Sequence, residues 1–456
     1  MIMLGHAIGQ IKDLPVPAWL FYYGAVIVLV VSFVGLGVLW RRPLLARTRR
    51  GRPLPEAAQR FLLSRGLRAV LGAVGFGLFV VISLSALVGD AEPSRNLAPT
   101  FVYVIFWVGL VPVSVLLGNV FAVLNPWRAA ADAVAWVWAR SGRAPLETFL
   151  YPERLGRWPG AVLLLAFAAL ELCYQDAADP RSLGIAILIY SWVAWVGMAL
   201  FGRETWLARG EAFAIYYGLL ARLAPFGVRE DGRRELVVRP PLSGLAVRDW
   251  LPGTVAFVAV MLGSVGFDGV SRTTWWLDRR FEIERQYAFT NPGLSETLVT
   301  LMYLGGLLGA VAVVALAYLA TVHLARIAAR VRRPLARVFV GSLVPIAMGY
   351  AIAHYFSLLI LQGQFAVPLA SDPLGRGWDL LGTADFSPNL GLLTPNAIWY
   401  VQVVALVVAH IFGLVLAHDR AVALIPSARR ALQAQYALLA LMVLYTCAGL
   451  WLLSHG

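Results

Sequence analysis

Polar side chains inside or beside long apolar segments have the clearest capacity for chemistry in this sequence. His354 lies about seven residues before the end of an apolar run, a depth of roughly 10 Å at the rise of a helix. Gln402 lies at a similar depth in the next apolar segment, and Glu296 begins the segment before. Near pH 7 a neutral imidazole binds a metal ion or accepts a proton. The pattern therefore predicts His354 as a catalytic base or metal ligand, with Gln402 and Glu296 beside it.

His410 is the second histidine deep inside an apolar segment. With His354 and Glu296 it is a candidate ligand of a divalent metal ion. A haem held by both histidines needs strongly tilted helices, because their depths differ by roughly 9 Å. Each histidine also has a structural interpretation, a hydrogen bond to a carbonyl or tyrosine of a neighbouring helix. The carboxylates Glu171, Asp268 and Glu296, at segment ends, either line a cavity with the histidines or are hydrated caps.

These side chains are positioned by ten segments that are long enough to cross a membrane. Of the 456 residues, 60% are hydrophobic and 14% are charged, whereas soluble domains have roughly a quarter charged. A helix needs about 20 apolar residues to cross a bilayer core of about 30 Å. The sequence therefore predicts an all-α, polytopic integral membrane bundle that forms one domain over 1–456. The segments are 17–40, 67–89, 99–124, 159–174, 182–202, 250–267, 296–322, 338–361, 397–417 and 433–453.

Two stretches between these segments, 125–140 and 205–223, have helical patterns of their own. Asn125 followed by Pro126 is typical of a helix start. Each stretch also places aromatic and aliphatic side chains along one side. Both are predicted to be interfacial helices that lie in the headgroup plane on the cytoplasmic side.

Two other connections, 268–295 and 362–396, are long loops on the outer side, and loops of such length are usually functional. In the second loop, Gly375, Gly377 and Gly382 allow tight turns, and Trp378 is a hydrophobic anchor. This loop is predicted to fold over the outer mouth of the bundle as an ordered lid.

The basic residues predict the orientation of the chain. The net charge is +13, and alternating loops place 30 of the 38 Lys and Arg residues on one side. By the positive-inside rule this side is cytoplasmic, so both termini lie outside. The partner of these charges is then the lipid bilayer and not nucleic acid.

Five strings of this sequence resemble bacterial membrane proteins of the fenitrothion hydrolase family. They are DLPVPAWLF (13–21), HYFSLLILQGQ (354–364), SDPLGRGWDLLGT (371–383), WYVQVVALVVAHIFGLVLAHDRA (399–421) and QYALLALMVLYTCAGLWLL (435–453). The resemblance implies a hydrolase of lipophilic organophosphorus esters in a bacterial inner membrane. The residues themselves leave a second class open, a non-enzymatic permease or a membrane subunit of a larger respiratory or cofactor-binding complex. No phosphate loop, dinucleotide fingerprint or HExxH motif occurs in the sequence.

Overall fold

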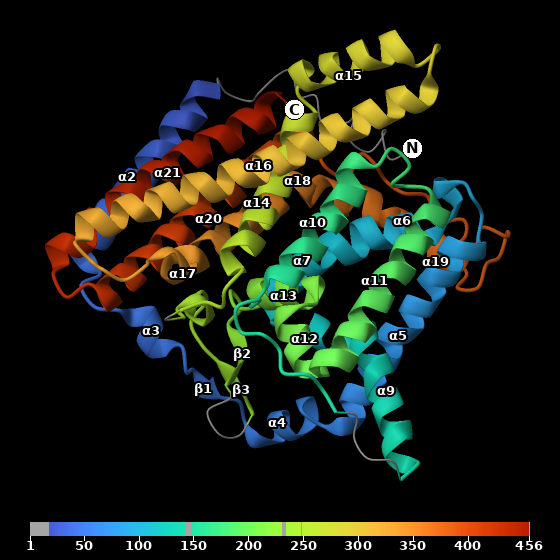
Figure 1. Ribbon diagram of the computed structural model, residues 1–456, viewed down its shortest axis with the longest axis horizontal. Coiled ribbons are helices and arrows are strands. Elements are labelled where there is room, and N and C mark those ends of the chain that lie inside the picture. Colours follow the sequence, from blue (N-terminus) through green and yellow to red (C-terminus); the bar gives the residue numbers. More distant parts are fainter. Residues whose placement is uncertain (1–17, 143–146, 230–233, 248, 456) are drawn as a thin grey trace.

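The computed structural model describes residues 18–142, 147–229, 234–247 and 249–455, and it consists almost entirely of helices (Figure 1). Nine helical units in this described part are long and apolar enough to cross a membrane. A tenth, α10 (Trp158–Cys173), is apolar but has only 16 residues, about 24 Å of helix. The ten units coincide with the ten predicted segments, which confirms the all-α membrane bundle.

The nine long units differ in how regular they are. Seven are single helices: α2 (Ala18–Leu39), α5 (Arg65–Val88), α11 (Pro180–Phe201), α14 (Thr254–Ser271), α16 (Pro292–Ala329), α20 (Pro395–Leu424) and α21 (Ala428–His455). The third unit along the chain joins α6 (Leu97–Thr100), a π-helical stretch (Phe101–Gly109) and α7 (Leu110–Leu117). The eighth of the ten units along the chain comprises α17 (Ala336–Phe339), a 3₁₀ turn (Val340–Leu343), α18 (Val344–Gln362), a second 3₁₀ turn (Gly363–Phe365) and α19 (Ala366–Ser371).

Local sequence signals define where several of these helices begin. Ser64, Asp179, Asn291 and Thr394 precede α5, α11, α16 and α20, and each side chain accepts a hydrogen bond from the backbone N–H three residues later. In α11, α16 and α20 a proline follows the cap directly. Such caps satisfy backbone donors that a helix leaves open, and proline has no such donor to satisfy.

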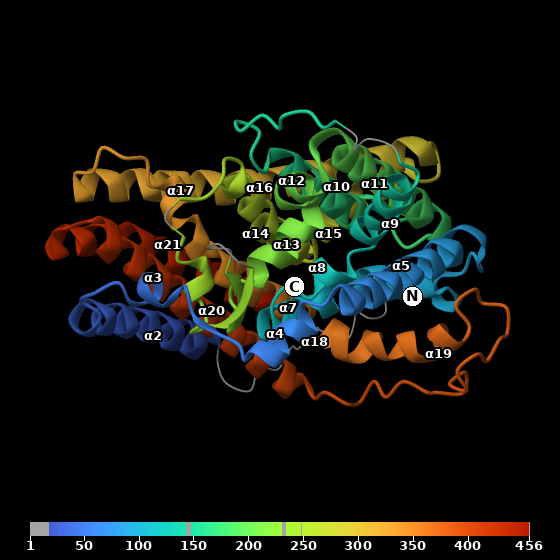
Figure 2. The ribbon, with the colours of Figure 1, turned by 90° about the horizontal axis from the view of Figure 1, so that it is seen from below.

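The centre of the bundle is α14, which packs against α10, α16, α18 and α21. In Figure 2, α14 lies between α16 and α18. Small residues let the helices approach closely. A Cβ atom on Gly263 would lie 2.6 Å from the Cα atom of Val311 in α16, and one on Gly349 of α18 would lie 2.2 Å from the Cβ atom of Ala409 in α20. Close approach through small residues is typical of packing in membranes.

The loops sort onto two faces as the sequence predicts. On one face, here called the arginine-rich face, β1 (Arg52–Pro53), β2 (Phe226–Arg229) and β3 (Glu235–Val238) form an antiparallel sheet in the order β1-β3-β2. This sheet links the connection between α2 and α5, which contains β1, to the connection between α11 and α14, which contains β2 and β3. The same face carries α3 (Leu44–Thr48), α4 (Glu56–Leu62), α8 (Phe121–Leu124), α9 (Pro126–Arg140), α12 (Arg203–Arg209) and a 3₁₀ turn (Ser243–Leu245).

The opposite face, at the top and upper right of Figure 1, gathers the α5–α6, α10–α11, α14–α16 and α19–α20 connections and both ends of the described chain. The hydroxyls of Tyr22, near the start of α2, and Ser454, near the end of α21, lie 3.4 Å apart. The backbone N–H of Asp90 donates to the carbonyl of Leu374 at 2.9 Å, which joins the α5–α6 connection, with its 3₁₀ turn Pro93–Arg95, to the loop after α19. The ends of the chain therefore share one face, as predicted.

Of the two predicted interfacial helices, only the first has an exposed apolar side. Asn125 caps α9 by accepting from the N–H of Arg128 at 2.9 Å, and Trp136 and Val137 of α9 are exposed. The stretch 205–223 is not a single interfacial helix. It breaks into α12 and α13 (Ala212–Leu220), and α13 is buried on all sides against α7, α8, α10 and α18. Its sequence AFAIYYGLL is apolar around the whole helix, which favours burial over a membrane surface.

A buried carboxylate fixes the break between α12 and α13. Glu211, with no exposed surface, accepts from the N–H groups of Phe213 and Ala214 at 3.0 and 2.7 Å. Asn125 donates to the same carboxylate at 3.3 Å, and the hydroxyl of Tyr190 donates as well. Burial raises the pKa of Glu211, and these hydrogen bonds oppose that change. The carboxylate therefore ties α13 to α9 and α11.

Both predicted long loops contain more helix than expected. In 268–295, α14 runs on to Ser271 and α15 (Thr274–Tyr287) fills most of the rest. In 362–396, helix continues to Ser371, and only 372–394 is irregular. Gly375, Gly377 and Gly382 have φ of +67°, +80° and +70°, which confirms the turns predicted there. This irregular part docks on the α5–α6 connection.

The orientation of the two faces relative to the cell stays a prediction, and cysteine labelling tests it. In a variant with both native cysteines replaced by alanine, a cysteine at position 50 on the arginine-rich face should resist a membrane-impermeant maleimide in intact cells. A cysteine at position 385, an exposed site on the opposite face, should react. The reason is the positive-inside rule. Labelling at position 50 before permeabilisation would contradict the orientation.

Candidate functional site

A polar cluster inside the bundle is centred on Asp268, near the end of α14 and only 5% exposed. The Nε2 atom of His354 lies 2.7 Å from Oδ2 of this carboxylate, and the hydroxyl of Tyr355 donates to the same oxygen at 3.0 Å. Arg272 donates to Oδ1 from Nη2 at 2.8 Å and from Nε at 3.2 Å. The carboxylate is thus held by three side chains, two of them from α18.

Helix geometry explains why these residues meet. Asp268 lies in the last turn of α14 and Arg272 caps the end of this helix four residues later, so the two side chains share one face. His354 and Tyr355 are consecutive on α18, and their rings lie 4.8 Å apart at 88°. Because α14 and α18 pack against each other, the two side chains reach the carboxylate together from different directions. The geometry fixes both the position and the orientation of the His354 ring.

Glu171 at the end of α10 adds a second carboxyl group. It is half-buried and lies within electrostatic range of Asp268 and Arg272. Glu171, Asp268, Arg272, His354 and Tyr355 are here called the Asp268 cluster. Its two carboxyl groups face a single guanidinium. In an apolar bundle such a set is electrically neutral only when it also binds one proton, on His354 or on a carboxyl group.

The hydrogen bonds determine which nitrogen of His354 is available. An ionised carboxylate only accepts hydrogen bonds, so Nε2 of His354 carries the hydrogen in its bond to Asp268. When the imidazole is neutral, Nδ1 then has the lone pair. Among the described residues, Nδ1 of His354 has no hydrogen-bond partner, and 13% of the side chain is exposed. His354 is therefore arranged as a base whose tautomer is set by Asp268.

The structure corrects the carboxylate that sequence analysis placed beside His354. Asp268 is the carboxylate on His354, whereas Glu296 is exposed near the start of α16. The buried side of α16 is formed by Ser295, Val299 and Tyr303, which follow each other at four-residue intervals. Glu296 is one residue beyond Ser295, about 100° further round the helix, and points away from the bundle.

Gln402 and His410, both on α20, are not brought into the Asp268 cluster. Gln402 is half-buried, with no side-chain hydrogen bond among the described residues. His410 has no exposed surface and lies beside the paired rings of Tyr350 and Tyr445, with ring centres 6.1 and 6.4 Å away. Its Nδ1 is 2.8 Å from the carbonyl of Leu406, four residues earlier in α20. His410 is therefore bonded to the backbone of its own helix, and not to a carbonyl or tyrosine of a neighbouring helix.

The residues do not fit the predicted divalent metal site. Within the part of the chain that the structure describes, no three His, Cys, Asp or Glu side chains are grouped so that they could hold a metal ion. His354, Glu296 and His410 are thus not gathered into one site. The carboxylate beside His354 already accepts from Arg272 and Tyr355, and a guanidinium next to a carboxylate opposes cation binding.

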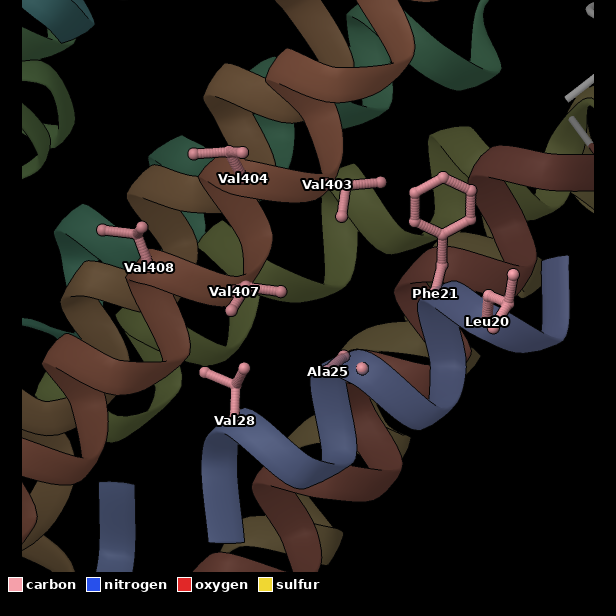
Figure 3. A pocket seen from close by; sticks show the side chains of 9 residues that line it. Leu20, Phe21, Ala25, Val28, Val403, Val404, Val407 and Val408 are labelled. Atoms are coloured by element: carbon pink, nitrogen blue, oxygen red, sulfur yellow. The ribbon is translucent and has the colours of Figure 1, made fainter. Parts of the chain in front are cut away.

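An apolar groove lies away from this chemistry, between α2 and α20 (Figure 3). It has a volume of about 260 Å³, and Val403 and Val407 of α20 face Phe21 and Ala25 of α2. Its lining also includes Leu20, Gly24, Val28, Val404 and Val408. None of these side chains can form a hydrogen bond, so the groove has no capacity for catalysis.

Sequence analysis underestimated Asp268 and missed Arg272 and Tyr355 altogether. A signal for the first pair was present, because Asp268 and Arg272 have opposite charges at a spacing of four at the end of an apolar segment. Tyr355 follows His354 directly in the sequence, but nothing in the sequence shows that both side chains reach one carboxylate on another helix.

Comparison with known proteins identifies no relative of this chain. No family model, curated protein or solved structure matches it. The chemistry of the Asp268 cluster is therefore the basis for the functional proposal.

Proposed function

We propose that this protein is a membrane-embedded hydrolase of lipophilic phosphoesters in which His354 is the general base. The observation that carries the proposal is the hydrogen bond between His354 and Asp268, inside an apolar bundle and within the last turn of α14. A carboxylate that orients an imidazole is a recurrent arrangement for removing a proton from a nucleophile. The resemblance to the fenitrothion hydrolase family gives the substrate class.

The proposed reaction moves one proton through His354. Nδ1 takes a proton from water, and the water oxygen forms a bond to phosphorus. The bond between phosphorus and the aryl oxygen breaks, and the proton passes from His354 to the leaving aryloxide. The products are a phosphodiester acid and a phenol. Asp268 stabilises the imidazolium that exists between the two proton transfers, and the resting proton of the cluster then resides on Glu171.

The membrane position suits the substrate class. An aryl phosphotriester has no charge and partitions into lipid, so a site within the bundle meets it at a raised local concentration. Ionic phosphodiester products leave toward water. The exposed fraction of His354 supports contact with a substrate, because a fully enclosed histidine such as His410 has no surface for one.

The direct test is hydrolysis by the purified protein. The full chain in lipid nanodiscs should release nitrophenol from a nitrophenyl phosphorothioate triester, as followed by absorbance. A general base commonly contributes about 10²- to 10⁴-fold to a rate, so turnover should clearly exceed that of empty nanodiscs. Equal rates with and without protein, for a series of phosphotriesters and phosphodiesters, would refute the proposal.

A proton-coupled permease is the second candidate, and the charge balance of the Asp268 cluster favours it. Two carboxyl groups facing one guanidinium inside a membrane form a site that takes up and releases a proton, as in many transporters. The two candidates differ in one measurement. A permease moves its solute unchanged across proteoliposomes when a pH gradient is imposed, whereas a hydrolase converts its substrate without any gradient.

A further inference from the structure

Three arginines gather around two aromatic rings on the arginine-rich face, far along α10 from Glu171. The guanidinium carbons of Arg157 and Arg222 lie 5.7 and 5.2 Å from the ring centre of Trp250. That of Arg209 lies 5.4 Å from the ring centre of Tyr151. Both rings are buried, and the three arginines are half-buried. The rings hold the cations in place, since a guanidinium is attracted to an aromatic face.

Two of these arginines, Arg157 and Arg209, have no acidic partner in the described part of the chain. Among the described residues, neither Arg157 nor Arg209 forms an ion pair with a carboxylate; Arg157 instead contacts the carbonyl of Ala208 at 3.4 Å and the hydroxyl of Thr254 at 3.5 Å. Burial, followed by the charges of Arg222 and Arg209, lowers the pKa of Arg157 to about 9.

The carboxylate next to Trp250 in the sequence is already paired. Asp249 precedes Trp250 directly and lies 3.5 and 3.3 Å from nitrogens of Arg333 and Arg337. It therefore compensates the arginines at the start of the eighth spanning unit. Asp249 therefore does not pair with Arg157 or Arg209.

Two helix starts add to the positive charge of these arginines. Arg157 directly precedes α10, and its N–H donates to the carbonyl of Pro252 at 2.7 Å, just before α14 begins at Thr254. Gly156 and Gly253 make the close approach possible with φ of +46° and +78°. A Cβ atom on Gly156 would lie 2.2 Å from the carbonyl oxygen of Pro252. The first N–H groups of the two helices, those of Trp158 and Thr254, donate to the carbonyls of Leu155 and Leu251, and the positive ends of the two adjacent helix dipoles favour anions.

We propose that Arg157, Arg209 and the starts of α10 and α14 form a binding site for a phosphate group. Planar guanidinium groups bind phosphate oxygens in pairs, and helix starts are recurrent phosphate sites. Arg222 lies beside the same indole ring and adds to the attraction. The phosphate belongs either to the headgroup of an anionic phospholipid in the adjacent leaflet or to a soluble phosphate compound. The site is independent of the proposed hydrolase activity.

Two measurements on the full-length protein distinguish a phospholipid headgroup from a soluble phosphate compound as the bound anion. Native mass spectrometry after exchange into mixed phosphatidylglycerol and phosphatidylcholine micelles reports a retained anionic lipid. Thermal unfolding with inorganic phosphate, against chloride at the same ionic strength, reports a soluble anion. Arg157→Gln and Arg209→Gln should each weaken the observed binding at least about tenfold, because a charged hydrogen bond contributes roughly that factor or more.

Arg154→Gln is the matched control, since Arg154 is exposed in the same connection and loses the same charge. It should bind as the wild type does. Arg157→Lys keeps the charge and should retain part of the binding. If Arg157→Gln does not fold, the binding measured for Arg209→Gln tests the proposal instead. If Arg154→Gln weakened the binding of lipid or phosphate as much as Arg157→Gln does, the anion would bind a diffuse basic surface and not a defined site. That result would overturn the proposal. Binding of neither phosphatidylglycerol nor phosphate above its control would overturn it as well.

Discussion

Replacement of His354 by glutamine should abolish hydrolysis while the protein stays folded and inserted. Glutamine can still donate a hydrogen bond to Asp268, so the side chain keeps a partner, but it cannot accept a proton at neutral pH. Loss of a general base lowers the rate by about 10²- to 10⁴-fold. The measurement is nitrophenol release per mole of protein in nanodiscs, normalised to monodisperse protein from size-exclusion chromatography.

A matched control exists in His323, which is exposed on α16 at the arginine-rich face. His323→Gln should leave the rate unchanged. Tyr355→Phe removes one of the donors to Asp268 and should have an intermediate effect, because Arg272 still holds the carboxylate. Retention of more than about a tenth of the wild-type rate in His354→Gln would show that His354 is a structural histidine, given the size of a base contribution.

The sequence predicts features that depend on segment length and local conformation. Ten apolar segments, their sorting onto two faces, the cap at Asn125 and the turns at Gly375, Gly377 and Gly382 all agree with the structure. Each depends on residues that are close together in the chain. A capping side chain reaches a backbone group three residues away, and a glycine with positive φ needs no distant partner.

The site could not be predicted in the same way, because it depends on how each helix is rotated about its axis. In α16, apolar side chains occur on all sides, so the sequence does not show that Ser295 faces inward and Glu296 outward. In a soluble protein the polar side of a helix indicates its rotation, but lipid accepts apolar residues on every side. A shift of one position along the sequence therefore decides whether a side chain such as Glu296 faces a neighbouring helix or points away from the bundle.

The location of α13 was wrong for a related reason. The stretch 205–223 is predicted to be a surface helix because it places aromatic and aliphatic side chains along one side. The structure instead inserts α13 among spanning helices, where the hydroxyl of Tyr217 donates to the carbonyl of Phe106 at 2.6 Å in the π-helical stretch. The wider turn of a π-helix often marks functional sites. This contact is between residues more than a hundred positions apart, which local patterns do not predict.

Replacement of Asp268 by asparagine should destabilise the protein more than any other single change in the Asp268 cluster. Removing one partner of a buried ion pair typically costs about 3 to 5 kcal/mol, although Glu171, which lies within electrostatic range of Arg272, offsets part of the charge left on the guanidinium. The side chain of Arg272 is 30% exposed, so water solvates it in part and the lower end, about 3 kcal/mol, applies. The measurement is the free energy of unfolding in detergent, with Asp278→Asn on the exposed side of α15 as the control.

A double variant separates lost packing from the uncompensated charge. If the guanidinium of Arg272 causes the destabilisation, then Asp268→Asn combined with Arg272→Gln should be more stable than Asp268→Asn alone. Coupling between residues in direct contact is commonly about 0.5 to 3 kcal/mol. The double variant should still lack hydrolysis, because His354 has lost the carboxylate that fixes its tautomer. A double variant that unfolds more readily than the single one would show that Arg272 is needed for packing and not for charge balance, and the electrostatic account of the cluster would then fail.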